Sequence, residues 1–393
     1  KKIMVEFEFW WLLVVPFFFL VGWIAARIDI RQIISESTDL PTAYFKGLNL
    51  IIDNEYEKAV ECFEQAVKIK KDSLELHFVL GSLLRKTGQI DKAINLHIGL
   101  IQKRELTKLQ TESVNAELAQ DYFKAGLYGR SEEILLTLKS ERYYQFALNT
   151  LIEIYVRERE WNKAINTASE LEKNSGVSFR VAISHYHCEV ATSYVMNKKY
   201  EQAKKSLQKA LEESKKCVRA NILLGDIALE EKLNSEAIVY WKKIEFQQPE
   251  YLGLVGLKLM NTYQLEGGTN DGLSVLARYY DLYKLKTLLN TLYSSVLKNE
   301  GVNQARDIAR NELIQRPSLR ALDQLFQAHA IDKKNEIENV ELIQQTIKNS
   351  IGDRRFYACK ECGFKAKQFH WQCPACNAWE SLPSEPIDII LEN

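Results

Sequence analysis

The sequence has 393 residues, more than one ordinary hydrophobic core accommodates, so it predicts several domains or a repeat array. Lysine plus arginine and aspartate plus glutamate both number 52, and a chain of zero formal net charge lacks the basic excess typical of a dedicated nucleic-acid binder. Only 7 prolines and 17 glycines leave room for few turns, which favours a mostly helical protein.

The first segment carries an uncharged apolar run, Phe9–Ala26. As a helix, its 18 residues would span about 27 Å, close to the hydrocarbon thickness of a bilayer. A signal peptide is the main alternative, but the run is long for one and no clear A-x-A site follows it. We therefore expect residues 1–30 to form a single-pass membrane anchor. If Met4 is the native start, Arg27 and Arg31 place the rest of the chain in the cytoplasm.

Residues 40–330 repeat a pattern of about 34 residues. In the first copy a small residue, Gly47, is followed by Tyr56, Ala59 and Phe63. The alanine position recurs along the chain, at Ala59, Ala93, Ser131, Ala164, Ala203, Ala237, Asp271 and Ala305. This is the tetratricopeptide pattern, in which small residues let two helices approach closely. We expect about eight units, with seven or nine as alternatives, and the unit around Asp271 matches the pattern least.

Such an array is all-α and stacks into a superhelical solenoid. It offers a groove to a peptide or a protein rather than a cleft lined by converging acids and bases. The sequence contains no Walker-type glycine-rich loop, no G-x-S-x-G and no H-E-x-x-H motif. We therefore expect a protein that is not an enzyme.

Three single cysteines, Cys62, Cys188 and Cys217, lie in helical sequence, as buried thiols do in a reducing compartment. His185 and His187 stand two residues apart, so they point about 200° apart on a helix and cannot chelate one ion together. Packing between helices is the expected role of His185. His185 and Cys188 could share a helix face, but two ligands do not make a metal site.

A polar stretch at residues 331–352 connects the array to the C-terminal part. It is predicted to be helical, because apolar residues recur at the spacing of one helix face, at Ile337, Val340, Ile343 and Ile347.

The last segment, residues 353–393, contains two C-x-x-C pairs, Cys359/Cys362 and Cys373/Cys376, with ten residues between them. Four thiolates in two tight turns can surround one ion tetrahedrally, so we predict a site for a single ion of zinc or iron. A domain this small cannot stabilise itself by burial alone. Metal ligation therefore has to supply its folding energy.

This segment is also rich in aromatic residues, namely Phe356, Tyr357, Phe364, Phe369, Trp371 and Trp379. They are too many for so small a domain to bury internally, so we expect them to dock the domain onto the repeats. A stacking platform for nucleic acid is the weaker alternative. Between Asp353 and Pro383, five basic residues face three acidic ones, and an excess of two is small for a phosphate-binding surface.

The order of these parts resembles the lipopolysaccharide assembly protein B family of Gram-negative bacteria, over essentially the whole chain. The most specific local matches are Cys359-x-x-Cys362-Gly363-Phe364, His370-Trp371-x-Cys373-Pro374-x-Cys376-x-Ala378-Trp379 and Asp121-Tyr122-x-x-Ala125-Gly126-Leu127-Tyr128. The resemblance implies an inner-membrane anchor, a cytoplasmic repeat array and a rubredoxin-like metal domain packed against it. It implies that the metal ligands are Cys359, Cys362, Cys373 and Cys376. One departure is Asn377, where such a turn usually has glycine, because asparagine tolerates the left-handed conformation less well.

The resemblance also implies a regulatory role. Family members help the membrane protease FtsH degrade LpxC, the deacetylase that commits material to lipid A. We therefore expect an adaptor that holds protein partners, FtsH-type and LpxC-type proteins among them, on its repeats. Two alternatives stay open: a scaffold that gathers lipopolysaccharide biosynthesis or transport proteins at the membrane, and a rubredoxin-like electron carrier.

Overall fold

The computed structural model describes residues 17–21, 23, 42–103, 105–332, 345–346 and 355–388. Most of the predicted anchor, residues 1–30, and most of the predicted connecting helix, residues 331–352, lie outside these ranges. Within them, no helix combines the length and the apolar character that crossing a bilayer requires. The chain divides into two compact units, Lys1–Ile154 and Tyr155–Asn393.

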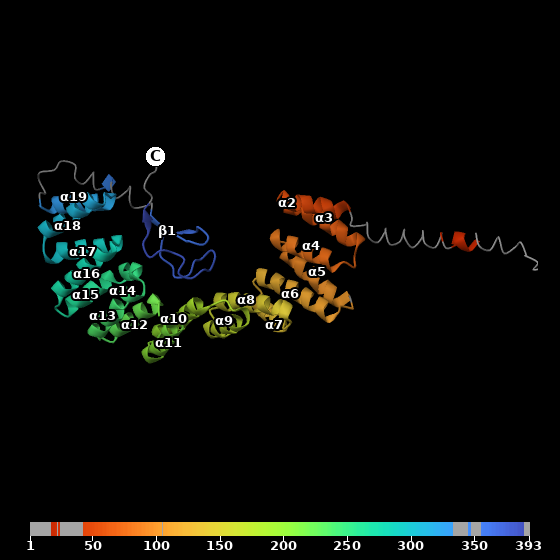
Figure 1. The fold of residues 1–393 in the computed structure, drawn as a ribbon, viewed down its shortest axis with the longest axis horizontal. Coiled ribbons are helices and arrows are strands. Elements are labelled where there is room, and N and C mark those ends of the chain that lie inside the picture. Colours follow the sequence, from red (N-terminus) through yellow and green to blue (C-terminus); the bar gives the residue numbers. More distant parts are fainter. Residues whose placement is uncertain are drawn as a thin grey trace, which may run out of the picture. The chain divides into compact units, whose positions relative to one another are not determined.

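The first compact unit consists of helix pairs joined by short turns (Figure 1). Its helices are α2 (Thr42–Ile52), α3 (Tyr56–Ile69), α4 (Leu74–Lys86), α5 (Ile90–Lys103), α6 (Lys108–Lys124), α7 (Tyr128–Leu135) and α8 (Glu141–Arg157), the last of which runs into the second unit.

The second compact unit continues the helix pairs and ends in a small sheet. Its helices are α9 (Trp161–Ser175), α10 (Arg180–Met196), α11 (Tyr200–Glu213), α12 (Val218–Glu230), α13 (Asn234–Lys242), α14 (Ile244–Gln247), the 3-10 helix η1 (Pro249–Leu254), α15 (Gly256–Leu265), α16 (Thr269–Tyr283), α17 (Lys286–Asn299), α18 (Val302–Gln315) and α19 (Leu319–Asp332). Three strands follow, β1 (Arg355–Ala358), β2 (Lys365–Ala366) and β3 (Ile387–Asp388), in the antiparallel order β2-β1-β3. A tetratricopeptide solenoid with a small C-terminal metal-type domain is therefore the fold, as the sequence predicted.

The turns within the helix pairs of residues 42–315 each contain one residue of positive φ, at Asn54, Gly88, Gly126, Arg159, Lys198, Lys232, Gly267 and Gly301. In seven of the eight turns a backbone N–H closes the six-residue hydrogen bond of a Schellman turn, as Glu55 N–H does to Leu50 O at 2.8 Å. The exception is the turn at Gly301 (φ 100°, ψ −179°), where Gly301 itself donates to Val296 O at 3.1 Å. Four of the seven left-handed residues are not glycine, so the left-handed conformation is imposed by the helix packing on either side.

The small residues of the pattern stand where two helices touch. The alanines of the predicted positions are fully buried, and Ser131 is buried with its hydroxyl donating to Ala119 O at 2.8 Å. On α12, Gly225 faces the fully buried indole of Trp241 on α13, and a methyl group at Gly225 would lie only 2.7 Å from Trp241 Cε2. Trp241 Nε1 donates to Ile222 O at 3.2 Å, which holds the ring against that glycine.

The seventh repeat corrects one sequence-based assignment. Asp271 is exposed and does not fill the small-residue position. That position belongs to Gly272, which is buried against Met260 and Tyr263. The predicted irregularity of this repeat is confirmed, because its first helix is divided into η1 and α15. The turn itself has the usual length, because Gly272 follows Gly267 by five positions just as Ala237 follows Lys232, so the extra residue that displaced the alignment lies upstream, between Ala237 and Gly267.

A buried ionic network ties three helices of the first compact unit together. Asp121 on α6 is fully buried and accepts from Arg85 Nη1 of α4 at 2.7 Å. Its second oxygen lies 2.5 Å from Nδ1 of His97 on α5, which is also fully buried. Glu117 takes the other nitrogen of Arg85 at 2.6 Å. Removing one partner would leave a buried charge uncompensated, so this network fixes the relative placement of these three helices.

Overpacking at Gly225 tests the close approach of helices. We expect Gly225→Ala to lower the free energy of unfolding by about 1–3 kcal/mol, because the buried Trp241 ring cannot move away. The matched control is Gly99→Ala within α5, where a methyl group meets no heavy atom within 4 Å. There the better helix propensity of alanine should stabilise by up to about 1 kcal/mol. Thermal unfolding followed by circular dichroism measures both, and equal shifts would contradict the packing argument.

Candidate metal centre and its docking site

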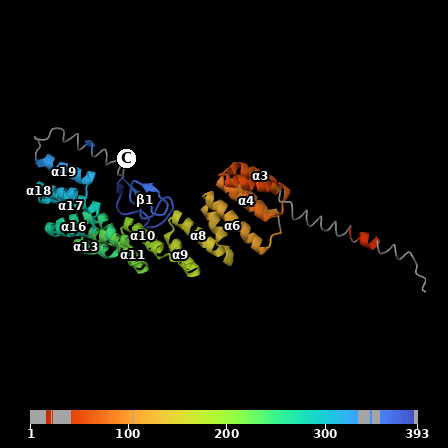
Figure 2. The same cartoon turned by 45° about the horizontal axis from the view of Figure 1, so that its top comes forward.

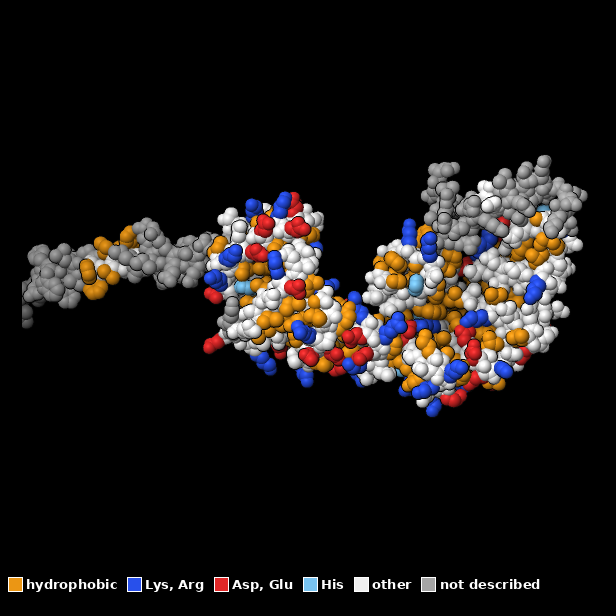
Figure 3. Space-filling model, turned by 180° about the vertical axis from the view of Figure 1, so that it is seen from behind, with side chains coloured by type: hydrophobic (Ala, Val, Ile, Leu, Met, Phe, Trp, Pro, Cys, Tyr) orange, Lys and Arg blue, Asp and Glu red, His pale blue; other side chains and the backbone are white. Residues whose placement is uncertain are grey.

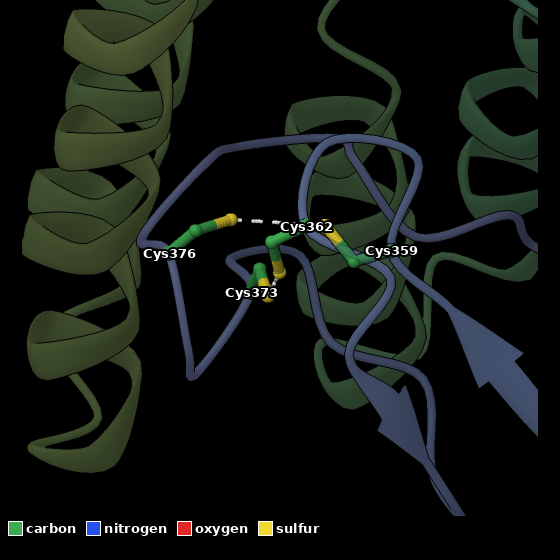
Figure 4. Close-up of side chains that lie close together, drawn as sticks. All are labelled: Cys359, Cys362, Cys373 and Cys376. Carbon is green, nitrogen blue, oxygen red and sulfur yellow. Dashed lines mark hydrogen bonds between the residues drawn. The ribbon is translucent and has the colours of Figure 1, made fainter. Parts of the chain in front are cut away.

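Four cysteine sulfurs converge in the C-terminal domain. Figure 4 shows the side chains of Cys359, Cys362, Cys373 and Cys376 pointing toward one another from two turns. The ligand atoms all lie within 4.8 Å of one another, and the pairs Cys359–Cys376 and Cys362–Cys373 are both 3.7 Å apart. A tetrahedral zinc site with Zn–S bonds of about 2.3 Å requires sulfurs about 3.8 Å apart. The cluster is therefore consistent with one metal ion bound by four thiolates.

Both turns that carry the cysteines use the same hydrogen bonds. The N–H of Cys359 donates to Phe364 O at 2.9 Å, and the N–H of Cys373 donates to Ala378 O at 2.8 Å. The residue after the second cysteine of each pair is left-handed, Gly363 at φ 72° and Asn377 at φ 60°. Asn377 thus adopts the backbone conformation that glycine adopts in the first turn. The presence of asparagine where such turns usually have glycine therefore leaves the backbone geometry of the second turn the same as that of the first.

The thiols of this cluster shift one another's pKa in opposite directions. A hydrogen bond with the Ser381 hydroxyl is the main cause that lowers the pKa of Cys359 to about 6. The Ala378 N–H lowers the pKa of Cys376, but desolvation and hydrogen bonds with the other three thiols outweigh it and raise this pKa to about 12. Four thiolates in such a small volume repel one another, so full ionisation requires a positive ion among them.

Aromatic stacking holds the metal domain against the repeats of the second compact unit. The Trp379 ring stacks on the fully buried His185 ring of α10, with centroids 4.5 Å apart and planes 10° apart. Trp371 stacks on Tyr251 of η1 at 5.3 Å and 22°, and Phe369 packs edge-on against Trp371 at 5.0 Å. In Figures 1 and 2 the domain accordingly lies beside the helices of this unit.

Polar contacts extend the docking site at both ends. Glu380 Oε1 lies 3.0 Å from His185 Nε2, and Ser384 donates to Glu250 O at 2.6 Å. The carboxylate of Glu385 accepts the N–H groups of Lys286 at 3.1 Å and Thr287 at 2.8 Å, and the Thr287 hydroxyl at 2.6 Å. The N-cap of α17, Leu285, has no side-chain acceptor, so a residue about 100 positions downstream caps this helix.

The sequence predicted that the aromatic residues of this domain dock it onto the repeats. Docking is confirmed for Phe369, Trp371 and Trp379, which contact the repeats. The other three are placed as follows: Tyr357 packs on Phe369 within the domain, Lys365 covers the ring of Phe356, and Phe364 is 38% exposed.

The single cysteines behave as predicted. Cys62, Cys188 and Cys217 are all buried, and the last two have sulfurs 3.8 Å apart. Packing was also the predicted role of His185, but its partners Trp379 and Glu380 come from the metal domain rather than from another repeat helix. Glu380 and Glu385 were not foreseen. Their only signal in the sequence is that both carboxylates follow the last cysteine closely.

Comparisons with known proteins agree with this architecture. A family described as "Rubredoxin metal binding domain" matches residues 357–383, and tetratricopeptide repeat families match residues 40–73 and 191–243. Lipopolysaccharide assembly protein B of Escherichia coli K12 is 27% identical over 365 residues, covering 92% of this chain and 94% of that protein. The protein of the same name from Haemophilus influenzae is 26% identical over 382 residues, covering 94% and 96%.

Among solved structures, the crystal structure of MamA protein aligns with 44% of this chain and 91% of its own, at 16% identity and a TM-score of 0.33. A score this low adds nothing to the description of the fold.

Loss of one buried thiol tests the metal centre. We expect Cys373→Ser to abolish stoichiometric metal binding, because the remaining three thiols cannot complete the tetrahedron around the ion. The small sheet should then lose its order, since ligation supplies about 10–16 kcal/mol of folding energy in sites of this kind. Metal content by mass spectrometry and hydrogen exchange in residues 355–388 measure both effects. The control is Cys62→Ser, and a Cys373→Ser protein with full metal content would refute the cluster as the binding site.

Glu385 tests the polar end of the docking site. Glu385→Gln replaces a charged acceptor of three hydrogen bonds by a neutral one, so we expect docking to weaken by about 1–2 kcal/mol. Amide exchange at Lys286 and Thr287 should accelerate about tenfold, as expected for a loss of about 1.4 kcal/mol. Glu236→Gln is the matched control, because Glu236 is an exposed carboxylate in the first turn of α13. Unchanged exchange in Glu385→Gln would show that this cap does not hold the domain.

Proposed function

This chain belongs to the lipopolysaccharide assembly protein B family, and from that premise we propose that it is a membrane-anchored adaptor, not an enzyme, that regulates lipopolysaccharide synthesis. One observation carries the proposal. The similarity to that family extends over 92% of the chain, so it includes both the repeats and the metal domain that docks on them. Tetratricopeptide repeats alone occur with many functions, whereas their union with this docked metal domain is specific.

The proposed mechanism is proximity. The N-terminal run Phe9–Ala26 confines the protein to the inner membrane, with the repeats facing the cytoplasm. There the repeats hold an LpxC-type deacetylase within reach of an FtsH-type membrane protease. Tethering both partners raises their effective concentration by orders of magnitude without new chemistry.

The metal domain has a structural part in this proposal. Cys359, Cys362, Cys373 and Cys376 would bind one ion of zinc or iron, and the ion would order the small domain. The ordered domain then presents Trp371, Trp379 and two carboxylates to the repeats. Its contribution is to stabilise the C-terminal repeats.

The charge distribution supports protein partners rather than nucleic acid. On the face shown in Figure 3, basic and acidic side chains are interspersed within each compact unit. Inter-repeat ion pairs occupy several of the basic groups, such as Lys258 with Asp226 at 2.7 Å and Arg278 with Glu245 at 2.7 Å. A phosphate backbone would require an unneutralised row of such groups.

The lifetime of the lipid A deacetylase in cells tests the proposal. After translation is blocked, depletion of this protein should lengthen the half-life of the deacetylase several-fold, and re-expression of the full chain should restore it. A chain that lacks residues 1–26 should fold but fail to restore the short half-life at native expression, since it is no longer confined to the membrane. An unchanged half-life on depletion would exclude the adaptor and favour a scaffold of lipopolysaccharide assembly proteins.

A further inference from the structure

Two buried thiols of the second compact unit lie side by side. Cys188 belongs to α10, and Cys217 stands directly before α12, at its N-cap position. Their sulfurs are 3.8 Å apart, although the two residues are 29 positions apart in the sequence. Because α10 and α12 are the first helices of successive repeats, the two free thiols meet where one repeat packs on the next.

Contacts on two sides hold these thiols together. Glu189 follows Cys188 directly and accepts from Arg219 Nη2 at 2.8 Å. Arg219 in turn stands two positions after Cys217, so this ion pair joins α10 to the first turn of α12. Gln247 of α14 donates at 2.7 Å to a backbone carbonyl of the loop that leads to Cys217. The meeting of the two sulfurs is therefore fixed by the surrounding structure.

The two thiols differ in their electrostatics. A hydrogen bond from the Cys188 thiol is the main cause that lowers the pKa of Cys217 against the effect of burial, and His185 and the N–H of Ala220 act in the same direction. The same hydrogen bond, together with burial, raises the pKa of Cys188. Thiolates are commonly stabilised at the first turn of a helix. Cys217 is thus the nucleophile of the pair, and Cys188 is the thiol placed to react with its oxidised form.

From this geometry we propose that Cys188 and Cys217 form a redox modification site, at which hydrogen peroxide closes a disulfide between successive repeats. The Cys217 thiolate attacks one oxygen of the peroxide, and the O–O bond breaks to leave a sulfenic acid on Cys217 and a hydroxide, which takes up the proton that Cys217 had lost. The Cys188 sulfur then attacks the sulfenic sulfur, and its proton leaves with the hydroxyl group as water. The two thiols lose two electrons and two protons, and the peroxide becomes two waters.

Distance and burial decide how this bond closes. The S–S bond of a disulfide is about 2.05 Å long, so the sulfurs must approach by about 1.8 Å, a displacement within reach of a change in cysteine χ1. Cys188 and Cys217 are 0% and 1% exposed, which keeps bulky disulfides such as oxidised glutathione away from them. Hydrogen peroxide is nearly as small as water and enters through local opening of the helices. The inference goes beyond the proposed function, because it concerns a response of the repeats to oxidant.

Peptide mapping of the purified full-length, metal-loaded protein tests the site. After treatment with stoichiometric hydrogen peroxide and alkylation of the remaining thiols, trypsin should release the peptide Val181–Lys198 joined to Cys217–Arg219. Dithiothreitol should separate the two peptides. We expect Cys217 to be oxidised at least about tenfold faster than Cys62, a buried thiol of α3 in the other compact unit.

Substitution of each thiol separates their roles. Cys217→Ser places a favoured N-cap residue before α12, so this protein should fold and should form no cross-link. Cys188→Ala should leave Cys217 reactive but stop the reaction at the sulfenic acid, which dimedone labels. Cys62→Ser is the matched control and should form the cross-link to the same extent as the wild type.

Closure of the disulfide should also be visible in the native protein. Amides in the first turn of α12 should exchange about tenfold more slowly after oxidation, because the bond tethers this turn to α10. Three outcomes would each refute the site. They are no cross-link between Cys188 and Cys217 in the wild type, oxidation of Cys62 as fast as that of Cys217, and a cross-link that forms only after the helical circular dichroism signal is lost.

Discussion

The close approach of two helices at one small residue in each repeat is the constraint on which the rest of the structure depends. A tetratricopeptide unit cannot bury its apolar face alone, so each pair of helices must pack tightly and then stack on its neighbours. Buried alanines and glycines allow the first contact, and large rings such as Trp241 fill the space beside it. A single added methyl group at such a site cannot be accommodated, because the ring opposite is fully buried and has no space into which to move.

That constraint has a consequence at long range. Since each repeat is positioned by the same contact, residues 34 positions apart come to lie in register along one face. His185 and Thr287, which are separated by three repeats, thereby contribute to one binding surface for the metal domain. The turns obey the same requirement, and residues such as Arg159 and Lys232 accept a left-handed backbone at a cost of about 1–2 kcal/mol each, which helix packing offsets.

The metal domain reverses the usual order of stabilisation. In the repeats, burial of apolar surface supplies most of the stability, and polar contacts add to it. In residues 355–388 the four-thiol cluster comes first, because too few apolar residues are buried to hold three short strands together. Three of its aromatic residues, Phe369, Trp371 and Trp379, attach the domain to the repeats. Stability of the domain, its docking and the capping of α17 by Glu385 are therefore linked to one ion.

The sequence by itself determined the parts whose signal is local or periodic. Recurring small residues predicted the helix pairs, and two C-x-x-C pairs at the right spacing predicted the cluster of Cys359, Cys362, Cys373 and Cys376. Contacts between distant segments carry no such signal, so only the tertiary structure decided that Glu380 meets His185 and that Glu385 caps α17. The seventh repeat shows the same limit, since one extra residue between Ala237 and Gly267 moved the small-residue position from Asp271 to Gly272. Sequence period locates a repeat, whereas packing decides which residue within it is buried.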